Sequence, residues 1–171
     1  MSERLNGRLA PLPVGTVAPD FSLPHTPHAR VALHSLPSTP IVLVFYPMDW
    51  EPVSREQLRL YQDFGDDFVF FGAQLLGVST DHVYSHAAFA RDAQIGFPLL
   101  ADVQPRGLVA GEYGVYHETQ GVSARALFVL DSQRIIRFGK TYPDALNPGV
   151  DELLSVLDSL AQEREDMQEN P

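Results

Sequence analysis

Runs of apolar residues alternate along this chain with segments whose apolar positions recur at helical spacing. Ile41–Tyr46 is a continuous run of β-branched and aromatic side chains, which is typical of a strand covered on both faces. Gln74–Val78 is a second run of this kind. Between them, a segment that begins near Pro52 repeats its apolar residues with a helical period and is expected to end at Gly65. The order strand, helix, strand is the unit of an α/β domain.

The rest of the chain extends this alternation and adds a hairpin. The final helix is capped by Asn147 and carries one apolar stripe at Val150, Leu153, Leu154, Leu157 and Leu160. The other expected elements are extended pieces at Asp20–Leu23 and Arg30–Leu33, a helix that follows capping residues Ser79–Asp81 and ends near Arg91, a strand at Phe97–Leu100, a short helix within Pro105–Tyr113, and hairpin strands at Ala126–Leu130 and Ile135–Phe138. We therefore predict an α/β fold with a central mixed sheet, partly parallel and partly antiparallel, flanked by helices.

The length of 171 residues suits one domain with a core of its own. We expect a flexible N-terminus over residues 1–14, a folded domain over 15–161, and an acidic tail over 162–171 in which a solvated helix end passes into a disordered terminus. The N-terminus lacks an apolar stretch typical of a secretory signal, and no apolar run is long enough to span a bilayer, so we expect a cytoplasmic protein.

The composition excludes further classes of binding partner and of chemistry. A formal net charge of −10 disfavours phosphate backbones and anionic lipid as partners, so we expect neither nucleic acid nor membrane binding. The chain contains no cysteine. Disulfides, thiolate metal sites and thiol redox chemistry carried by the protein alone are therefore excluded.

Three segments together resemble a known family. Gly15–Pro24 resembles the opening of peroxiredoxins of the alkyl hydroperoxide reductase and thiol-specific antioxidant type. Val44–Asp49 is similar to the strand end that leads into their active site, and Gly121–Asp131 to the segment that brings an arginine to the reactive thiol. The resemblance covers about Gly15 to Leu160. It implies a thioredoxin-like fold with the peroxiredoxin N-terminal extension, no cofactor, and a homodimer as a candidate assembly.

The resemblance also assigns places to candidate site residues. The family's active-site pattern is a proline, three residues, a threonine or serine, two residues, and the peroxidatic cysteine. In this sequence the proline is Pro47, the threonine position holds Glu51 and the cysteine position holds Ser54. Gln57 stands where many members carry glutamate, and Arg125 matches the family's arginine.

These substitutions change the chemistry that the resemblance implies. The hydroxyl pKa of serine lies far above that of a thiol, and a helix N-terminus with an arginine does not close the gap. Glu51 places a carboxylate where the peroxide would bind, and it could pair with Arg125 or Arg55. The leading hypothesis is therefore a peroxiredoxin-family protein without peroxidase activity, which acts in binding or regulation. Two alternatives stay open: a genuine peroxidase of hydroperoxides, if Ser54 replaces a natural cysteine, and different chemistry built on Glu51, Ser54 and Arg125.

Other polar groups give weaker signals. A serine hydrolase centred on Ser54 would need a nucleophile elbow, which the sequence lacks. His82 and His86 have the i, i+4 spacing of paired metal ligands, with Asp81 beside them, but this spacing is more often a solvated helix face, so we expect no metal site. Trp50 either anchors a partner or packs over the start of the helix at Pro52.

Overall fold

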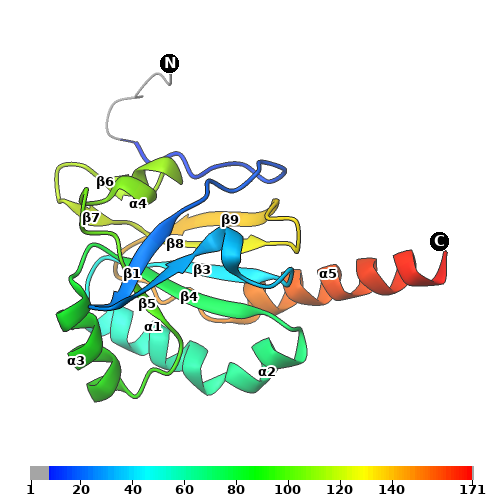
Figure 1. Cartoon of the computed structure of the whole chain (residues 1–171), viewed down its shortest axis with the longest axis horizontal. Coiled ribbons are helices and arrows are strands. Elements are labelled where there is room, and N and C mark those ends of the chain that lie inside the picture. Colours follow the sequence, from blue (N-terminus) through cyan, green and yellow to red (C-terminus); the bar gives the residue numbers. More distant parts are fainter. Residues whose placement is uncertain (1–7, 171) are drawn as a thin grey trace.

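A five-stranded mixed sheet runs through the middle of the molecule (Figure 1). The computed structural model describes residues 8–170. The strand order is β5-β4-β3-β8-β9. The parallel strands are β3 (Ile41–Phe45), β4 (Gln74–Ser79) and β5 (Leu99–Ala101), and β8 (Arg125–Leu130) and β9 (Ile136–Tyr142) add an antiparallel half. This arrangement confirms the predicted mixed sheet.

Helices cover the two faces of the sheet unequally (Figure 1). The helices are α1 (Pro52–Asp63), α2 (Gly65–Phe70), α3 (Val83–Ala93), α4 (Leu108–Glu112) and α5 (Asp151–Glu169). Because side chains alternate along β3, Val42 and Val44 join the core shared with α1, α3 and α5. Ile41 and Leu43 join the opposite core, which is closed by α4 and the N-terminal segment. The run Ile41–Phe45 is thus covered on both faces, as its composition predicts.

Smaller elements surround this frame. An antiparallel hairpin is formed by β1 (Ser22–Thr26) and β2 (Ala29–Ala32), followed by the 3₁₀ turn η1 (Leu33–Ser35). A second short pair is β6 (Tyr116–His117) with β7 (Val122–Ser123). No helix within residues 8–170 has both the length and the apolar character to cross a membrane.

Local signals at the helix ends were predicted less well than the elements themselves. Gly65 does not end the helical region, because α2 begins there after a short break at Phe64. The N-cap of α5 is Val150, and Asn147 instead accepts a hydrogen bond from the Gly149 N–H in the preceding turn. The N-cap of α3 is His82, since Asp81 is engaged by the backbone N–H of Asp49.

Residues 8–14 and 162–169, near the two ends of the chain, have a defined structure. Residues 1–7 of the segment expected to be flexible lie outside the described residues. The part from residue 8 onward is attached to the body, since Ala10 N–H donates to Gly114 O at 3.0 Å and Leu12 N–H donates to Tyr113 O at 3.2 Å. The tail also differs from the expectation, because α5 continues to Glu169 and extends past the end of the sheet (Figure 1).

Candidate functional site

The loop between β3 and α1 ends at Glu51, whose side chain caps the N-terminus of α1. Pro47 is buried directly after β3, and Pro52 occupies the first turn of α1, where its missing N–H costs nothing. Glu51 is the N-cap, with extended backbone. Its carboxylate accepts the N–H groups of Val53 at 2.9 Å and Ser54 at 2.7 Å, two of the donors that a helix leaves unpaired at its N-terminus.

Ser54 lies in the first turn of α1 with no solvent exposure. Its hydroxyl donates to Glu51 Oε2 at 2.7 Å. The hydroxyl and the backbone N–H of Ser54 therefore both point at the same carboxylate oxygen. A small molecule that sought these donors would have to displace Glu51.

Arg125 completes the group from the sheet side. It is the first residue of β8 and is completely buried. Its Nη2 lies 2.9 Å from Glu51 Oε2, and its Nη1 lies 2.8 Å from Gln57 Oε1 and 3.3 Å from Ser54 Oγ. Nε and Nη2 also donate to the Asp144 carbonyl at 3.1 and 2.8 Å. The structure thus brings together Glu51, Ser54, Gln57 and Arg125, and it confirms the Glu51–Arg125 ion pair that the sequence raised.

A chain of hydrogen bonds continues from Gln57 into the core. Gln57 Nε2 donates to the Tyr61 hydroxyl at 3.1 Å, which donates to the Gly149 carbonyl at 2.9 Å. Burial raises the pKa of Tyr61, and the hydrogen bond from Gln57 only partly offsets it, so this hydroxyl keeps its proton. The helical period of the segment that begins at Pro52 does not reveal this polar contact of Tyr61, and a carbonyl partner such as Gly149 leaves no trace in the sequence.

The electrostatics favour a charged Glu51. Burial raises the pKa of the Glu51 carboxyl, but hydrogen bonds from the Ser54 hydroxyl, the Val53 and Ser54 N–H groups and Arg125 outweigh this, and its pKa lies below the ordinary value. A carboxylate with a lowered pKa is a weak general base. Although Glu51 accepts a hydrogen bond from the Ser54 hydroxyl, the pair is therefore poorly suited to activate a serine nucleophile, and Ser54 is closed to solvent.

Arg55, the other predicted partner of Glu51, points elsewhere. Its guanidinium contacts Asp92 on α3, and both side chains are exposed to a large extent. Trp50 packs on α3, and its predicted role as a partner anchor stays a prediction. Its side chain is half exposed, while its ring meets Phe89 edge to face at 5.4 Å between centroids.

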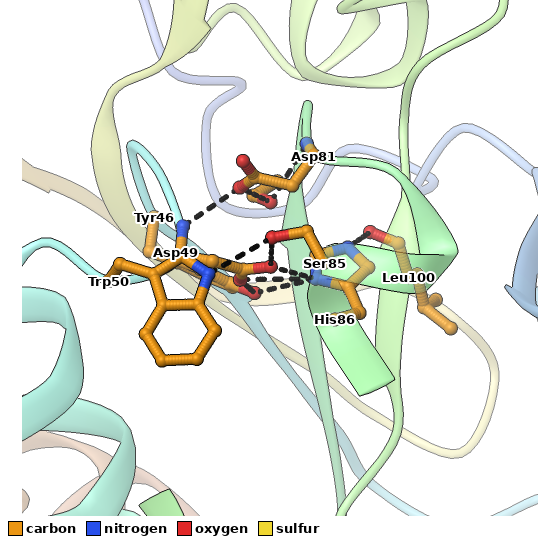
Figure 2. Close-up of polar contacts among 8 residues, drawn as sticks. Tyr46, Asp49, Trp50, Asp81, Ser85, His86 and Leu100 are labelled. Atoms are coloured by element: carbon orange, nitrogen blue, oxygen red, sulfur yellow. Dashed lines mark hydrogen bonds and ion pairs between the residues drawn. The ribbon is translucent and has the colours of Figure 1, made fainter. Parts of the chain in front are cut away.

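The histidines with i, i+4 spacing do not face one site. His82 is the N-cap of α3, where its extended backbone takes it off the helical face, and its ring stacks on Tyr84. His86 is buried. Among residues 8–170, the group with potential metal-ligand atoms within 4.8 Å of one another is Asp49, Asp81 and His86 (Figure 2). The carboxylates of Asp49 and Asp81 already accept hydrogen bonds from protein donors, so a metal ion that bound here would have to replace these hydrogen bonds.

Comparisons with known proteins identify relatives across most of the chain. Residues 14–138 match the model of the AhpC/TSA family. Peroxiredoxin 2 of Thermoplasma acidophilum is 33% identical over 153 residues, which cover 86% of this chain and 75% of that protein. Alkyl hydroperoxide reductase E of Mycobacterium tuberculosis is 32% identical over 130 residues, which cover 75% of this chain and 85% of that protein.

Solved structures agree with this assignment. The reduced 2-Cys peroxiredoxin of Plasmodium vivax superposes with a TM-score of 0.82 at 25% identity, covering 91% of this chain and 85% of that chain. Peroxidoxin BcpB of Mycobacterium tuberculosis superposes with a TM-score of 0.77 at 28% identity, covering 86% of this chain and 97% of that chain. The predicted thioredoxin-like fold of the peroxiredoxins is confirmed.

Proposed function

This chain belongs to the AhpC/TSA family, and from that premise we propose that it is a peroxiredoxin-like protein without thiol peroxidase activity, which serves as a binding or regulatory protein. The family's antioxidant chemistry depends on a thiolate that attacks a peroxide oxygen and becomes a sulfenic acid. The chain has no cysteine, and Ser54 stands at the position that matches the family's peroxidatic cysteine. A buried serine whose hydroxyl donates a hydrogen bond to Glu51 does not supply this chemistry.

The observation that carries the proposal is the position of the Glu51 carboxylate. The donors that would hold and polarise a peroxide are the helix N–H groups, the residue 54 side chain and Arg125. In this molecule Val53 N–H, Ser54 N–H, Ser54 O–H and Arg125 Nη2 all donate to Glu51. The loss of the thiol is therefore accompanied by an internal anion in the place of the substrate.

A peroxide-consumption assay with an external thiol reductant tests the proposal. We expect the unmodified chain and Ser54→Cys to remain at the buffer rate, since a thiol next to the Glu51 carboxylate has a raised pKa. Glu51→Thr/Ser54→Cys is expected to consume peroxide measurably, and Glu51→Thr alone is the matched control without sulfur. Turnover by the unmodified chain would contradict the proposal, as would a cysteine codon at position 54 of the gene.

We also propose a homodimer that uses the loop containing Trp50. Met48 and Trp50 expose 43% and 51% of their surface, which is considerable for large apolar residues on one loop. Light scattering over a range of concentrations is expected to show dimers that Trp50→Ala weakens. Phe70→Ser, an exposed aromatic on α2, is the matched control. A monomer at every concentration would overturn the dimer. The cytoplasmic location stays a prediction.

A further inference from the structure

A second polar cluster lies under the loop that leads to Glu51, and nothing in the proposed function uses it. Asp49 from this loop and His86 from α3 are both buried and face each other, with 2.9 Å between Asp49 Oδ2 and His86 Nδ1 (Figure 2). The other ring nitrogen, His86 Nε2, lies 3.1 Å from the carbonyl oxygen of Leu100 in β5. The imidazole therefore bridges the loop and the sheet.

The hydrogen-bond partners of its two ring nitrogens fix the protons of His86. The Tyr46 hydroxyl also lies 3.3 Å from Nδ1, but it is closer to Asp49 Oδ1, at 2.7 Å, and donates there. A backbone carbonyl only accepts, so Nε2 must carry a proton to bond Leu100. A neutral imidazole would then present the lone pair of Nδ1 to the Asp49 carboxylate, which is also an acceptor. Both contacts are satisfied when a second proton lies between Nδ1 and Asp49. The Asp49–His86 pair thus carries one proton more than a neutral imidazole beside an ionised carboxylate.

The surroundings of Asp49 place the negative charge on its carboxylate. The Tyr46 hydroxyl donates to Oδ1 at 2.7 Å, and the Ser85 hydroxyl donates to Oδ2 at 2.8 Å. Burial raises the pKa of Tyr46 far above its ordinary value, and Asp49 raises it further, so Tyr46 remains a donor. Two hydroxyl donors stabilise a carboxylate over a carboxylic acid. The enclosed proton therefore belongs to His86, as an imidazolium.

One more titratable group faces the pair. Asp81, from the loop after β4, accepts the Asp49 backbone N–H at 2.8 Å and the Ser79 hydroxyl at 2.6 Å. Burial raises the pKa of Asp81, against the hydrogen bonds from Ser79 and Asp49. Asp81 thereby fixes the backbone of Asp49 while His86 fixes its side chain. Tyr46, Asp49, Asp81 and His86 are the titratable groups of this cluster that the hydrogen bonds join (Figure 2).

The cluster reaches the surface through Trp50. The indole N–H of Trp50 donates to Ser85 Oγ at 3.3 Å, and Ser85 in turn donates to Asp49 (Figure 2). Trp50 has a φ of 69°, in the left-handed region. This conformation is unfavourable for a bulky residue and persists only where the surrounding contacts hold it. The residue next to it is Glu51, the cap of α1. Release of Asp49 would therefore free the strained residue and the cap together.

We propose that Asp49 and His86 form a carboxylate–imidazolium pair that acts as a latch on residues 47–51 and sets the position of Trp50. With one enclosed proton the latch is closed. The proposal concerns a different cluster from the one at Ser54 and does not depend on the loss of peroxidase activity.

The protonation state can be measured directly on the unmodified protein. Long-range ¹H–¹⁵N correlation spectra of the histidine side chains at neutral pH are expected to show both His86 nitrogens in the protonated range. His82, on the exposed start of α3, is the internal reference for an ordinary histidine. An unprotonated Nδ1 in His86 would overturn the latch, and so would chemical shifts altered by chelator treatment, which would mean that a metal lies in the proton's place.

Tryptophan fluorescence then tests the mechanical link, because Trp50 is the single tryptophan of the chain. Asp49→Asn is expected to shift the Trp50 emission to the red at neutral pH, and Ser85→Ala is expected to do so while His86 stays doubly protonated. His82→Gln is the matched control and should leave both signals unchanged. If Asp49→Asn does not fold, the Ser85→Ala comparison decides. Emission that does not respond to the loss of Ser85 would contradict the link to Trp50.

Discussion

Arg125 Nη2 lies 2.9 Å from Glu51 Oε2, although the two residues are 74 positions apart in the chain. One belongs to the start of β8 and the other to the cap of α1. The guanidinium is completely buried, whereas the Glu51 side chain keeps 26% of its exposure. The pair therefore joins the sheet to the helix that covers it and neutralises a cation that has no contact with water.

Arg125→Lys is expected to destabilise the fold by about 3 kcal/mol, because an ammonium group cannot reach Glu51, Gln57 and the Asp144 carbonyl together. Denaturant unfolding measures the loss. Arg55→Lys is the matched control, since the Arg55–Asp92 pair is exposed and should change stability by less than about 1 kcal/mol. Equal effects of the two substitutions would contradict the special position of Arg125.

The Glu51 carboxylate gives the fold a defined dependence on pH. The pKa of Glu51 is lower in the folded state than the ordinary 4.5. Its contribution to the free energy of unfolding is therefore fully present above pH 4.5 and is lost as the pH falls through the pKa of the folded state. Glu51→Gln is expected to cost about 2 kcal/mol near neutral pH, where charged hydrogen bonds are removed. The difference from the unmodified chain should shrink in acid.

Thermal unfolding of both proteins over a pH series measures this difference. Glu163→Gln on α5 is the control, because Glu163 pairs with Arg137 at the surface and should give a small, nearly constant effect. A gap between the unmodified chain and Glu51→Gln that widens in acid would show that the sign is wrong.

The hydroxyl of Tyr61 links α1 to the loop before α5. Tyr61→Phe leaves Gln57 Nε2 and the Gly149 carbonyl without this partner, and we expect a loss of about 1–2 kcal/mol in denaturant unfolding. Tyr84→Phe removes an exposed hydroxyl on α3 and should be neutral. A neutral Tyr61→Phe would mean that the hydrogen-bond chain adds nothing to stability.

The attachment of the N-terminal segment can be tested at Gly114. A Cβ at this position would overlap the carbonyl oxygen of Ala10, and Gly114 also has a φ of 75°. Gly114→Ala is expected to detach residues 8–14 and to expose them to proteases. Gly72→Ala has the same backbone cost, with a φ of 68° and open space around its Cβ, so it should destabilise by only about 1 kcal/mol and leave the segment protected. Equal protection in both variants would contradict the attachment.

The strands were predictable because burial on both faces leaves continuous apolar runs, as in Ile41–Phe45. Helix ends were harder, since several residues can cap equally well in sequence. Asn147 and Asp81 both form hydrogen bonds, but the first closes a turn and the second holds the backbone of Asp49. The last helix extends further than expected, up to Glu169, because the composition of the tail resembles that of a disordered segment.

The candidate site could be predicted as far as its charged side chains. Glu51 and Arg125 attract each other wherever the fold brings them near, so the ion pair followed from the resemblance and from charge. The carbonyls of Asp144 and Gly149 could not be predicted, because every residue has one. The i, i+4 spacing of His82 and His86 would place the two rings on one face only if both residues were helical. His82 is instead the extended N-cap of α3, so the two rings do not face one site.

The capping of α1 by Glu51 also bears on how this pocket could gain thiol chemistry by mutation. A mutation that introduced cysteine at position 54 alone would place a thiol against a carboxylate that occupies both the helix N-terminus and Arg125. A mutation that removed Glu51 alone would leave Arg125 buried without its counter-charge and would weaken the fold. Each single change is thus without benefit or harmful, and only the two changes together would open a route to thiol chemistry.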